Sequence, residues 1–260
     1  MKNKVTAHMI VKNEDIWVWF AVQAILDSME KIIIYDTGST DKTLEIVDTF
    51  KSDKIQLIKM SPLKDGEDFY EKFTKCKNEM IEMTTTPWWL CVDGDEIYSN
   101  SINEMVNKLH EIPEEYTVLS VRMKYFVEHL HRVSAEDVTY RYAFVRTGAH
   151  RWGYGYGDEI LCFPQPVKDQ RLSYWYSRES WEFDCFHTSF LQRSSLDTSE
   201  NSEAYQRKHR QLRSQVGKLY NGMYGYCGPY PEVFYRKDIP EIVKNQYIEQ
   251  IYKTKEEFGM

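Results

Sequence analysis

Short apolar runs alternate with longer amphipathic segments along the first hundred residues of the chain. Four of the runs are five to seven residues long and rich in β-branched or aromatic residues, which predicts buried strands of a parallel sheet. Capping residues and apolar periodicity predict helices between and after them. The strands are expected at residues 5–11, 31–35, 55–60 and 88–92. The helices are expected at 15–28, after a cap at Ser39, Thr40 or Asp41, at 69–83 and at 101–111, the last ending before Pro113.

The segment 69–83 has the clearest helical pattern. Its apolar residues follow one another at intervals of four, three, four and three positions, so they fall on one narrow stripe of a helix. Lys77 lies beside this stripe, and Asn78, which faces away from it, is not expected to be a site residue. The stripe consists of Phe69, Phe73, Cys76, Met80 and Met83.

This alternation of strands and helices predicts an α/β fold: a mostly parallel central sheet with right-handed crossovers and helices on both faces. In such sheets, ligands bind outside the carboxyl ends of the strands. Asn13, Asp36 and Asp93 each follow a predicted strand directly. We therefore expect three polar turns to converge on one edge of the sheet.

The pattern changes after residue 115. Longer strands of antiparallel type are expected at 118–127 and 138–146, a short strand at 159–163, and loose alternation at 180–190. Residues 200–220 are expected to form a basic helix. Its charged face would either be solvated or contact a diphosphate or an anionic acceptor. The tail, punctuated by glycine and proline, is expected to be an irregular covering segment. The chain is expected to divide into three parts, which comprise residues 1–115, 116–198 and 199–260.

Composition narrows the class of protein. The 260 residues are 42% apolar, enough for one sizeable core, and 15% aromatic, which suits either a ring-rich core or a cleft that stacks rings on flat ligands. The net charge is −7, and the first hundred residues hold 12 Lys and no Arg against 18 Asp and Glu. Such an acidic half is a poor surface for nucleic acid but suits a site that takes up a metal ion.

Five cysteines stand far apart, without a CxxC pair. An odd number without such spacing argues against a disulfide framework or a zinc site and for a reducing compartment. The N-terminus shows no secretory signal, and the apolar run at 16–26 is too short to span a bilayer. A soluble cytoplasmic protein is therefore expected.

The four residues Asp93, Gly94, Asp95 and Glu96 form an acidic turn directly after the apolar strand at 88–92. Two carboxylates flanking a glycine, a DXD pattern, make a compact oxygen site of the kind that Mg²⁺ or Mn²⁺ prefers. A metal ion there would neutralise a diphosphate and make it a better leaving group. The alternative is an ordinary acidic turn that caps the next helix.

Four stretches of the chain resemble the family 2 glycosyltransferases of the GT-A fold, and within them the branch of lipopolysaccharide-core glucosyltransferase-like proteins. The resemblance is specific in order and spacing over residues 5–100 and faint beyond 115. It implies a Rossmann-like sheet, with a nucleotide-sugar-binding half at 1–115 and an acceptor half at 116–198. The matching stretches are 9–14, 35–43, 77–78 and 89–96.

The resemblance implies that the nucleotide is held at the ends of the first two strands. Val11, Asn13 and Asp36 would border the base and ribose, with Asp36 as the base-binding residue. Asp36 has the alternative role of capping its own loop. Lys77 stands where relatives often carry Arg, and it would either meet the diphosphate as a point charge or lie on a solvated helix face.

The metal site follows from the same resemblance. Asp95 corresponds to the principal metal ligand, Asp93 to a ribose or metal contact, and Gly94 belongs to the same turn. GT-A enzymes often recruit a histidine near the C-terminus as another ligand, and His187 stands in that place. A structural histidine is the alternative.

The segment 151–161 corresponds to the loop in which relatives place a His-Glu pair. Glu159 keeps the carboxylate and is the expected catalytic base, which would deprotonate the acceptor hydroxyl. Asp158 replaces the expected histidine and is the second candidate. An ordinary turn before a strand is the alternative. Three rings of the segment are candidates to stack on an acceptor sugar: Trp152, Tyr154 and Tyr156.

These features predict a metal-dependent glycosyltransferase with a nucleoside-diphosphate sugar, UDP-linked, as donor, and the family resemblance implies that it is inverting. A glycan, a lipid-linked sugar or a protein side chain would be the acceptor, and a lipid-linked one would bring peripheral membrane contact. A nucleotidyltransferase would carry a Gly-rich loop after the first strand, where this chain has Val11-Lys12-Asn13-Glu14. A non-catalytic nucleotide- or carbohydrate-binding module is the third hypothesis.

Overall fold

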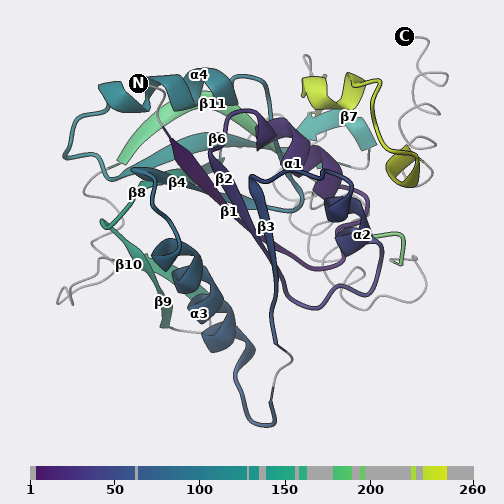
Figure 1. The fold of residues 1–260 in the computed structure, drawn as a ribbon. Coiled ribbons are helices and arrows are strands. Elements are labelled where there is room, and N and C mark those ends of the chain that lie inside the picture. Colours follow the sequence, from purple (N-terminus) through teal and green to yellow (C-terminus); the bar gives the residue numbers. More distant parts are fainter. Residues whose placement is uncertain are drawn as a thin grey trace.

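The computed structural model describes residues 4–61, 64–127, 129–134, 139–155, 158–162, 178–188, 194–196, 224–226 and 231–244. Within them a mixed sheet forms the centre, and helices cover both of its faces (Figure 1). Its strands are β1 (Val5–Val11), β2 (Lys31–Asp36), β3 (Ile55–Lys59), β4 (Trp88–Asp93), β5 (Glu96–Tyr98), β6 (Val118–Val127), β7 (His129–Ser134), β8 (Thr139–Arg146), β11 (Arg178–His187) and β12 (Tyr224–Tyr226), while β9 (Arg151–Gly155) and β10 (Asp158–Cys162) form a separate hairpin. The helices are α1 (Val18–Leu26), α2 (Thr43–Asp48), α3 (Phe69–Glu82), α4 (Ile102–Lys108), η1 (Leu109–Glu111) and η3 (Glu232–Tyr235).

The first four strands confirm the predicted α/β order. β1 pairs in parallel with β2 on one side and with β4 on the other, and β3 pairs in parallel with β2. Val11 lies opposite Asp36, and Ile10 lies opposite Asp93. The polar turns that follow these strands therefore begin side by side at one edge of the sheet, as the strand order predicts.

The two faces of the sheet have separate cores. On one face, α1, α2 and α4 contribute to a single large cluster with side chains of β1. On the other, Cys76 and Met80 of α3 pack against Ile33 and Tyr35 of β2. The expected coverage of both faces is thus confirmed.

Helix α3 begins at the predicted residue because the side chain of Asp68 caps it, accepting a 2.9 Å hydrogen bond from a backbone N–H of the first turn. Its apolar stripe is less deeply buried than the spacing suggests. Cys76 and Met80 are buried, whereas Phe69 and Phe73 are half-buried and stack on each other with ring centroids 5.6 Å apart.

Helix α1 is shorter than the predicted span 15–28. Asn13 has a positive φ of 54°, and the chain turns until Trp17 before the helix begins at Val18. Asp15, the first residue of the predicted span, accepts a 2.7 Å hydrogen bond from the backbone N–H of Ser195. The polar side chains before α1 therefore make contacts at the edge of the sheet and do not cap the helix.

The second half extends the same sheet. β8 pairs antiparallel with β4 and with β6, as expected for the longer strands. β11 pairs in parallel with β6 and antiparallel with β5, so it returns to the centre of the molecule beside the acidic turn. The strands β5, β7, β9 and β12 were not predicted, because they are short or lack clear alternation.

Part of the tail covers the core. β12 pairs antiparallel with β7, and Phe234 of η3 lies 5.1 Å from the ring of Phe20 and 6.2 Å from that of Phe126. The predicted basic helix at 200–220 lies outside the described residues, and the boundary at 198/199 stays a prediction. In the part of the chain that the structure describes, no helix is long and apolar enough to cross a bilayer.

Candidate nucleotide and metal site

The turns after β1 and β2 are tied together by polar contacts. The backbone N–H of Asn13 donates to Ser39 Oγ at 3.0 Å, and Asn13 Oδ1 accepts from the backbone N–H of Thr40 at 2.8 Å. The backbone N–H of Thr37 donates to the carbonyl of Val11 at 3.0 Å. Asn13 and Val11, both predicted site residues, thus lie where the two turns join.

Asp36 is buried at the end of β2, with 3% of its surface exposed. Its carboxylate accepts hydrogen bonds from the backbone N–H groups of Gly38 and Ser39, at 3.2 and 3.0 Å. Gly38 has a φ of 106°, which a residue with a Cβ rarely adopts. Asp36 therefore caps its own loop, and its role in base binding stays a prediction.

A segment from later in the chain contacts these turns, and no sequence pattern indicated it. Ser195 donates to both carboxylate oxygens of Asp15, through its backbone N–H and its hydroxyl, and Ser194 Oγ donates to Asp41 Oδ2 at 2.6 Å. Burial, and secondarily the neighbouring charge of Asp41, raises the pKa of Asp15. We call residues 194–196 the serine strap.

The acidic turn after β4 is held by its own members. The backbone N–H of Asp93 donates to Glu96 Oε2 at 2.9 Å, and the Glu96 side chain is fully buried. Gly94 lies against the turn after β1: a Cβ there would stand 2.9 Å from Val11 Cγ1 and 3.1 Å from Glu14 Cγ. Only a glycine lets the two turns approach so closely.

Arg141 of β8 places a cation at this turn, and it was not predicted from the sequence. Its Nη1 lies 3.0 Å from Asp93 Oδ2 and also pairs with Glu96, while Nη2 is 3.5 Å from Cys91 Sγ. Burial opposes the charge, but Asp93 and Cys91 outweigh it and raise the pKa of Arg141. An arginine between two tyrosines of a predicted strand was the signal available.

Asp95 and His187 meet, as the resemblance implied. His187 Nε2 lies 3.2 Å from Asp95 Oδ2, and their side chains are 19% and 3% exposed. The pairing of β11 with β5 places them together, and the backbone N–H of Thr188 donates to the carbonyl of Asp95 at 2.9 Å. An imidazole nitrogen and a carboxylate oxygen this close are able to bind the same divalent cation.

Two side chains do not complete a metal site. Among the described residues, no group of three or more His, Cys, Asp or Glu side chains is placed to hold a metal ion. Small divalent cations are commonly held by one or two carboxylates, with substrate phosphates and water as the other ligands. The pair of Asp95 and His187 fits that arrangement, and the ligation itself stays a prediction.

Lys77 and Asn78 both contact the hairpin of β9 and β10. Lys77 Nζ lies 4.0 Å from the ring of Trp152 and 4.8 Å from that of Phe73, as in cation–π pairs. Asn78, which was not expected to matter, bonds both backbone groups of Trp152 at 2.9 Å. Trp152 is 4% exposed and packs beside Trp89, so the prediction that it stacks on an acceptor sugar is wrong.

The expected catalytic residues Glu159 and Asp158 belong to β10, where Glu159 pairs with Tyr154 and Asp158 with Gly155. Their side chains lie outside the described part of the structure, as do the side chain of Tyr154 and the whole of Tyr156. Their roles stay predictions.

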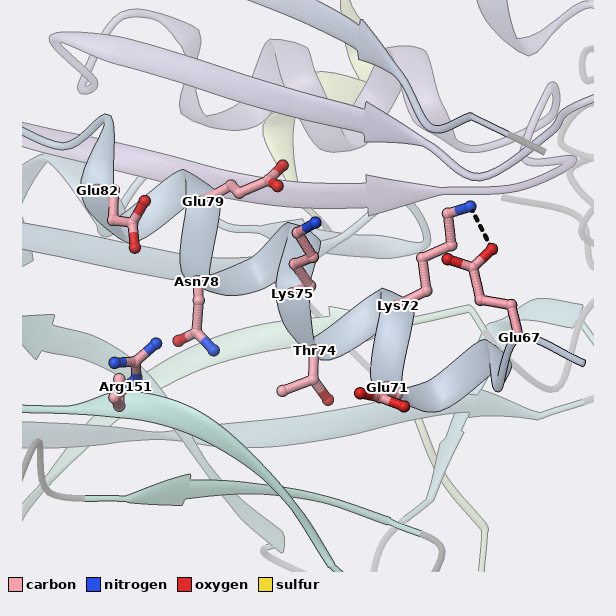
Figure 2. Close-up of a pocket in the computed structure, with 9 residues that line it drawn as sticks. All are labelled: Glu67, Glu71, Lys72, Thr74, Lys75, Asn78, Glu79, Glu82 and Arg151. Carbon is pink, nitrogen blue, oxygen red and sulfur yellow. Dashed lines mark hydrogen bonds and ion pairs between the residues drawn. The ribbon is translucent and has the colours of Figure 1, made fainter. Parts of the chain in front are cut away.

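A cleft of about 560 Å³ runs along the outer side of α3 (Figure 2). None of its lining residues belongs to the turns after β1, β2 or β4, so it is distinct from the nucleotide edge. Three of its charged groups have partners: Lys72 pairs with Glu67 at 2.8 Å, and Glu79 accepts a 2.7 Å hydrogen bond from Tyr35. We interpret it as a solvated helix face.

Comparison with known proteins agrees with this geometry. The family model described as glycosyl transferase family 2 matches residues 6–164. The chain belongs to this family. Its fold is GT-A-like, with the mixed sheet and flanking helices described above.

The individual relatives share low sequence identity with this chain and match only part of it. The SPbeta prophage-derived glycosyltransferase SunS of Bacillus subtilis is 28% identical over 129 residues, which cover 48% of this chain and 28% of SunS. An uncharacterized glycosyltransferase of Rickettsia bellii is 24% identical over 129 residues, which cover 50% of this chain and 40% of that protein. Less than half of either relative is thus matched.

Two solved structures show how distant the structural similarity is. A crystal structure of S. aureus TarS 1-349 covers 85% of this chain and 76% of its own, at 14% identity and a TM-score of 0.48. Glucosyl-3-phosphoglycerate synthase from Mycobacterium tuberculosis, crystallised with Mn²⁺, UDP and phosphoglyceric acid, covers 46% and 43%, at 15% identity and a TM-score of 0.35. Donor and acceptor therefore have to be argued from the residues of this chain.

Proposed function

We propose that this glycosyltransferase is metal-dependent and inverting, and that it moves a hexosyl unit from a nucleoside-diphosphate donor, a UDP-sugar, to an acceptor hydroxyl. The observation that carries the proposal is the 3.2 Å approach of Asp95 Oδ2 and His187 Nε2. It lies on the edge where the turns after β1 and β2 are joined. A carboxylate, an imidazole and two polar turns form a site for a diphosphate with its cation.

Each part of the edge has a role in donor binding. Asp95 and His187 would hold Mn²⁺ or Mg²⁺, which supplies neutralising charge to the diphosphate as it leaves. Asp93 is 42% exposed, so its carboxylate is accessible to the ribose or the metal. The turn of Val11 and Asn13, and the loop capped by Asp36, would border the base. Lys77 would add positive charge near the diphosphate.

Inversion requires a base on the side of the sugar opposite the diphosphate. Glu159 would take the proton of the acceptor hydroxyl while its oxygen attacks the anomeric carbon and the diphosphate leaves. Asp158 is the alternative base. The hairpin that carries both is fixed to α3 through the two hydrogen bonds of Asn78 to Trp152.

The acceptor is proposed more broadly: a glycan, a lipid-linked sugar or a protein side chain. The motifs at the donor edge favour the lipopolysaccharide-core glucosyltransferase-like branch of the family. A lipid-linked acceptor would bring the enzyme to a membrane surface. The free, buried thiols of Cys76, Cys91 and Cys185 accord with the proposed cytoplasmic location.

The test compares Asp95→Asn with Asp53→Asn, the same change at an exposed position at the opposite end of the strands. A panel of nucleotide sugars is screened by thermal shift with Mn²⁺, and the best donor is then assayed for hydrolysis and transfer. Asp95→Asn should reduce metal-dependent turnover at least about a hundredfold, and Asp53→Asn should leave it unchanged. Full metal-dependent activity of Asp95→Asn would refute the assignment. Metal-dependent UDP binding without turnover on any donor would indicate a binding module.

A further inference from the structure

Arg141 is the central contact of the acidic turn, although it comes from a strand about 45 residues further along the chain. β8 pairs antiparallel with β4, and the register joins Trp88 to Arg146 and Leu90 to Phe144. Arg141 lies three residues beyond this paired stretch, and its Nη1 reaches Asp93 Oδ2 at 3.0 Å. The arginine is thus built into the sheet that carries the turn.

Its guanidinium contacts the carboxylates of Asp93 and Glu96. It lies 3.0 Å from Asp93 Oδ2 and pairs with Glu96, whereas Asp95 Oδ2 faces His187. Glu96 is fully buried and also accepts the backbone N–H of Asp93. Nη1 makes both carboxylate contacts, and Nη2 lies 3.5 Å from Cys91 Sγ. The planar guanidinium is thus oriented through two of its nitrogens, which the single nitrogen of a lysine cannot reproduce.

The contacts divide the turn into two parts. Three carboxylates and one guanidinium leave a net charge of −2, and the arginine neutralises the side of Asp93 and Glu96. Asp95, whose Oδ2 lies 3.2 Å from His187 Nε2, is the carboxylate of the turn that would hold a metal ion together with this imidazole. If Asp93 were released, two carboxylates two residues apart would compete for the same ion.

We propose that Arg141 is the positioning residue of the metal turn: it holds Asp93 and Glu96 so that the metal is bound by Asp95 and His187 in one geometry. This inference rests on the proposed function. Arg141 belongs to the acceptor half of the chain, so a residue of that half would determine the geometry of the donor site. It also gives Glu96 a role, although its fully buried side chain is not accessible to a ligand.

The experiment uses the full-length chain and two probes, Mn²⁺ alone and UDP with Mn²⁺. Arg141→Met is compared with Arg141→Lys and with Arg146→Met, the same change in the same strand. Arg146 bonds backbone carbonyls and lies over Trp88, away from the turn. The double variant Arg141→Met/Glu96→Gln removes both buried charges and keeps the net charge of the turn at −2. Mn²⁺ binding is followed by electron paramagnetic resonance, and folding by thermal unfolding.

Arg141→Met should bind Mn²⁺ alone at least as tightly as wild type, because the turn becomes more negative, yet bind UDP with Mn²⁺ about tenfold or more weakly. Arg141→Lys should recover part of the UDP affinity. The double variant should regain the unfolding temperature of wild type but not its UDP affinity, and Arg146→Met should lose stability only.

Recovery of UDP affinity in the double variant would overturn the proposal, because neutralising Glu96 would then be the whole role of Arg141. Arg141→Met behaving like Arg146→Met would overturn it as well. If wild type bound neither Mn²⁺ nor UDP, the proposed function itself would fail and this inference with it.

Discussion

Replacing Gly94 by alanine should disturb both the fold and the site, because the added methyl group has no space. Its Cβ would stand 2.9 Å from Val11 Cγ1 and 3.1 Å from Glu14 Cγ, and both neighbours are 1% exposed. One of the two turns must therefore move by about half an ångström to reach ordinary van der Waals distance. Overpacking of this kind costs about 1–3 kcal/mol of unfolding free energy.

The same displacement should reduce catalysis, since Gly94 separates Asp93 from Asp95. A shift of about 1 Å at a reacting group costs on the order of a hundredfold, so half of that predicts a loss of about tenfold in kcat/KM. Urea titrations of Gly94→Ala and wild type measure the stability, and donor turnover with Mn²⁺ measures the activity.

The variant Val11→Ala/Gly94→Ala is the control, because it removes Val11 Cγ1, the atom nearest to the new Cβ. Val11→Ala alone should destabilise the protein by about 2 kcal/mol, and the double variant should be more stable than the sum of the two single changes by about 1 kcal/mol or more. Additive losses, or an unchanged Gly94→Ala protein, would refute the reasoning.

Three further predictions concern the surroundings of the site. Burial lowers the pKa of His8 to about 3 from 6.5, so the unfolded chain binds this proton more readily and stability falls as the pH drops below about 6.5. The unfolding free energy of His8→Phe, measured by urea titration, should therefore rise by about 2 kcal/mol relative to that of wild type as the pH falls from 7 to 5. Asn78→Leu removes two hydrogen bonds to Trp152, so it should lower the unfolding free energy by about 2 kcal/mol. It should also speed hydrogen exchange of the Trp152 amide. Ser195→Ala should lower the unfolding free energy by about 1–2 kcal/mol, because the buried carboxylate of Asp15 loses a donor. A pH-independent difference for His8→Phe, an unchanged amide exchange rate or an unchanged urea midpoint would contradict the respective expectation.

The donor edge was predictable because local patterns determine it. The strands at 5–11, 31–36 and 88–93 are apolar enough to be buried, and their parallel order places the following turns at one edge whatever their chemistry. Asp95 and His187 needed the family resemblance as well, since no periodicity joins residues 92 positions apart.

The missed residues act through contacts that only the folded chain creates. Arg141 reaches Asp93 across two antiparallel strands, and Asn78 reaches the backbone of Trp152, although the helical wheel places it away from the core. A helical wheel separates buried from exposed positions relative to one sheet. It does not show that a hairpin from later in the chain packs against the other side of the helix.

The charges of the site suggest an order of events. The carboxylates of Asp36, Asp93 and Asp95 surround the edge, and among the described contacts of the acidic turn Arg141 is already engaged with two of its carboxylates. A diphosphate approaching this edge without a cation would meet mainly like charge. We therefore expect donor binding to require the metal ion, either bound first or brought with the nucleotide, and the acidic first half of the chain is the sequence feature behind that requirement.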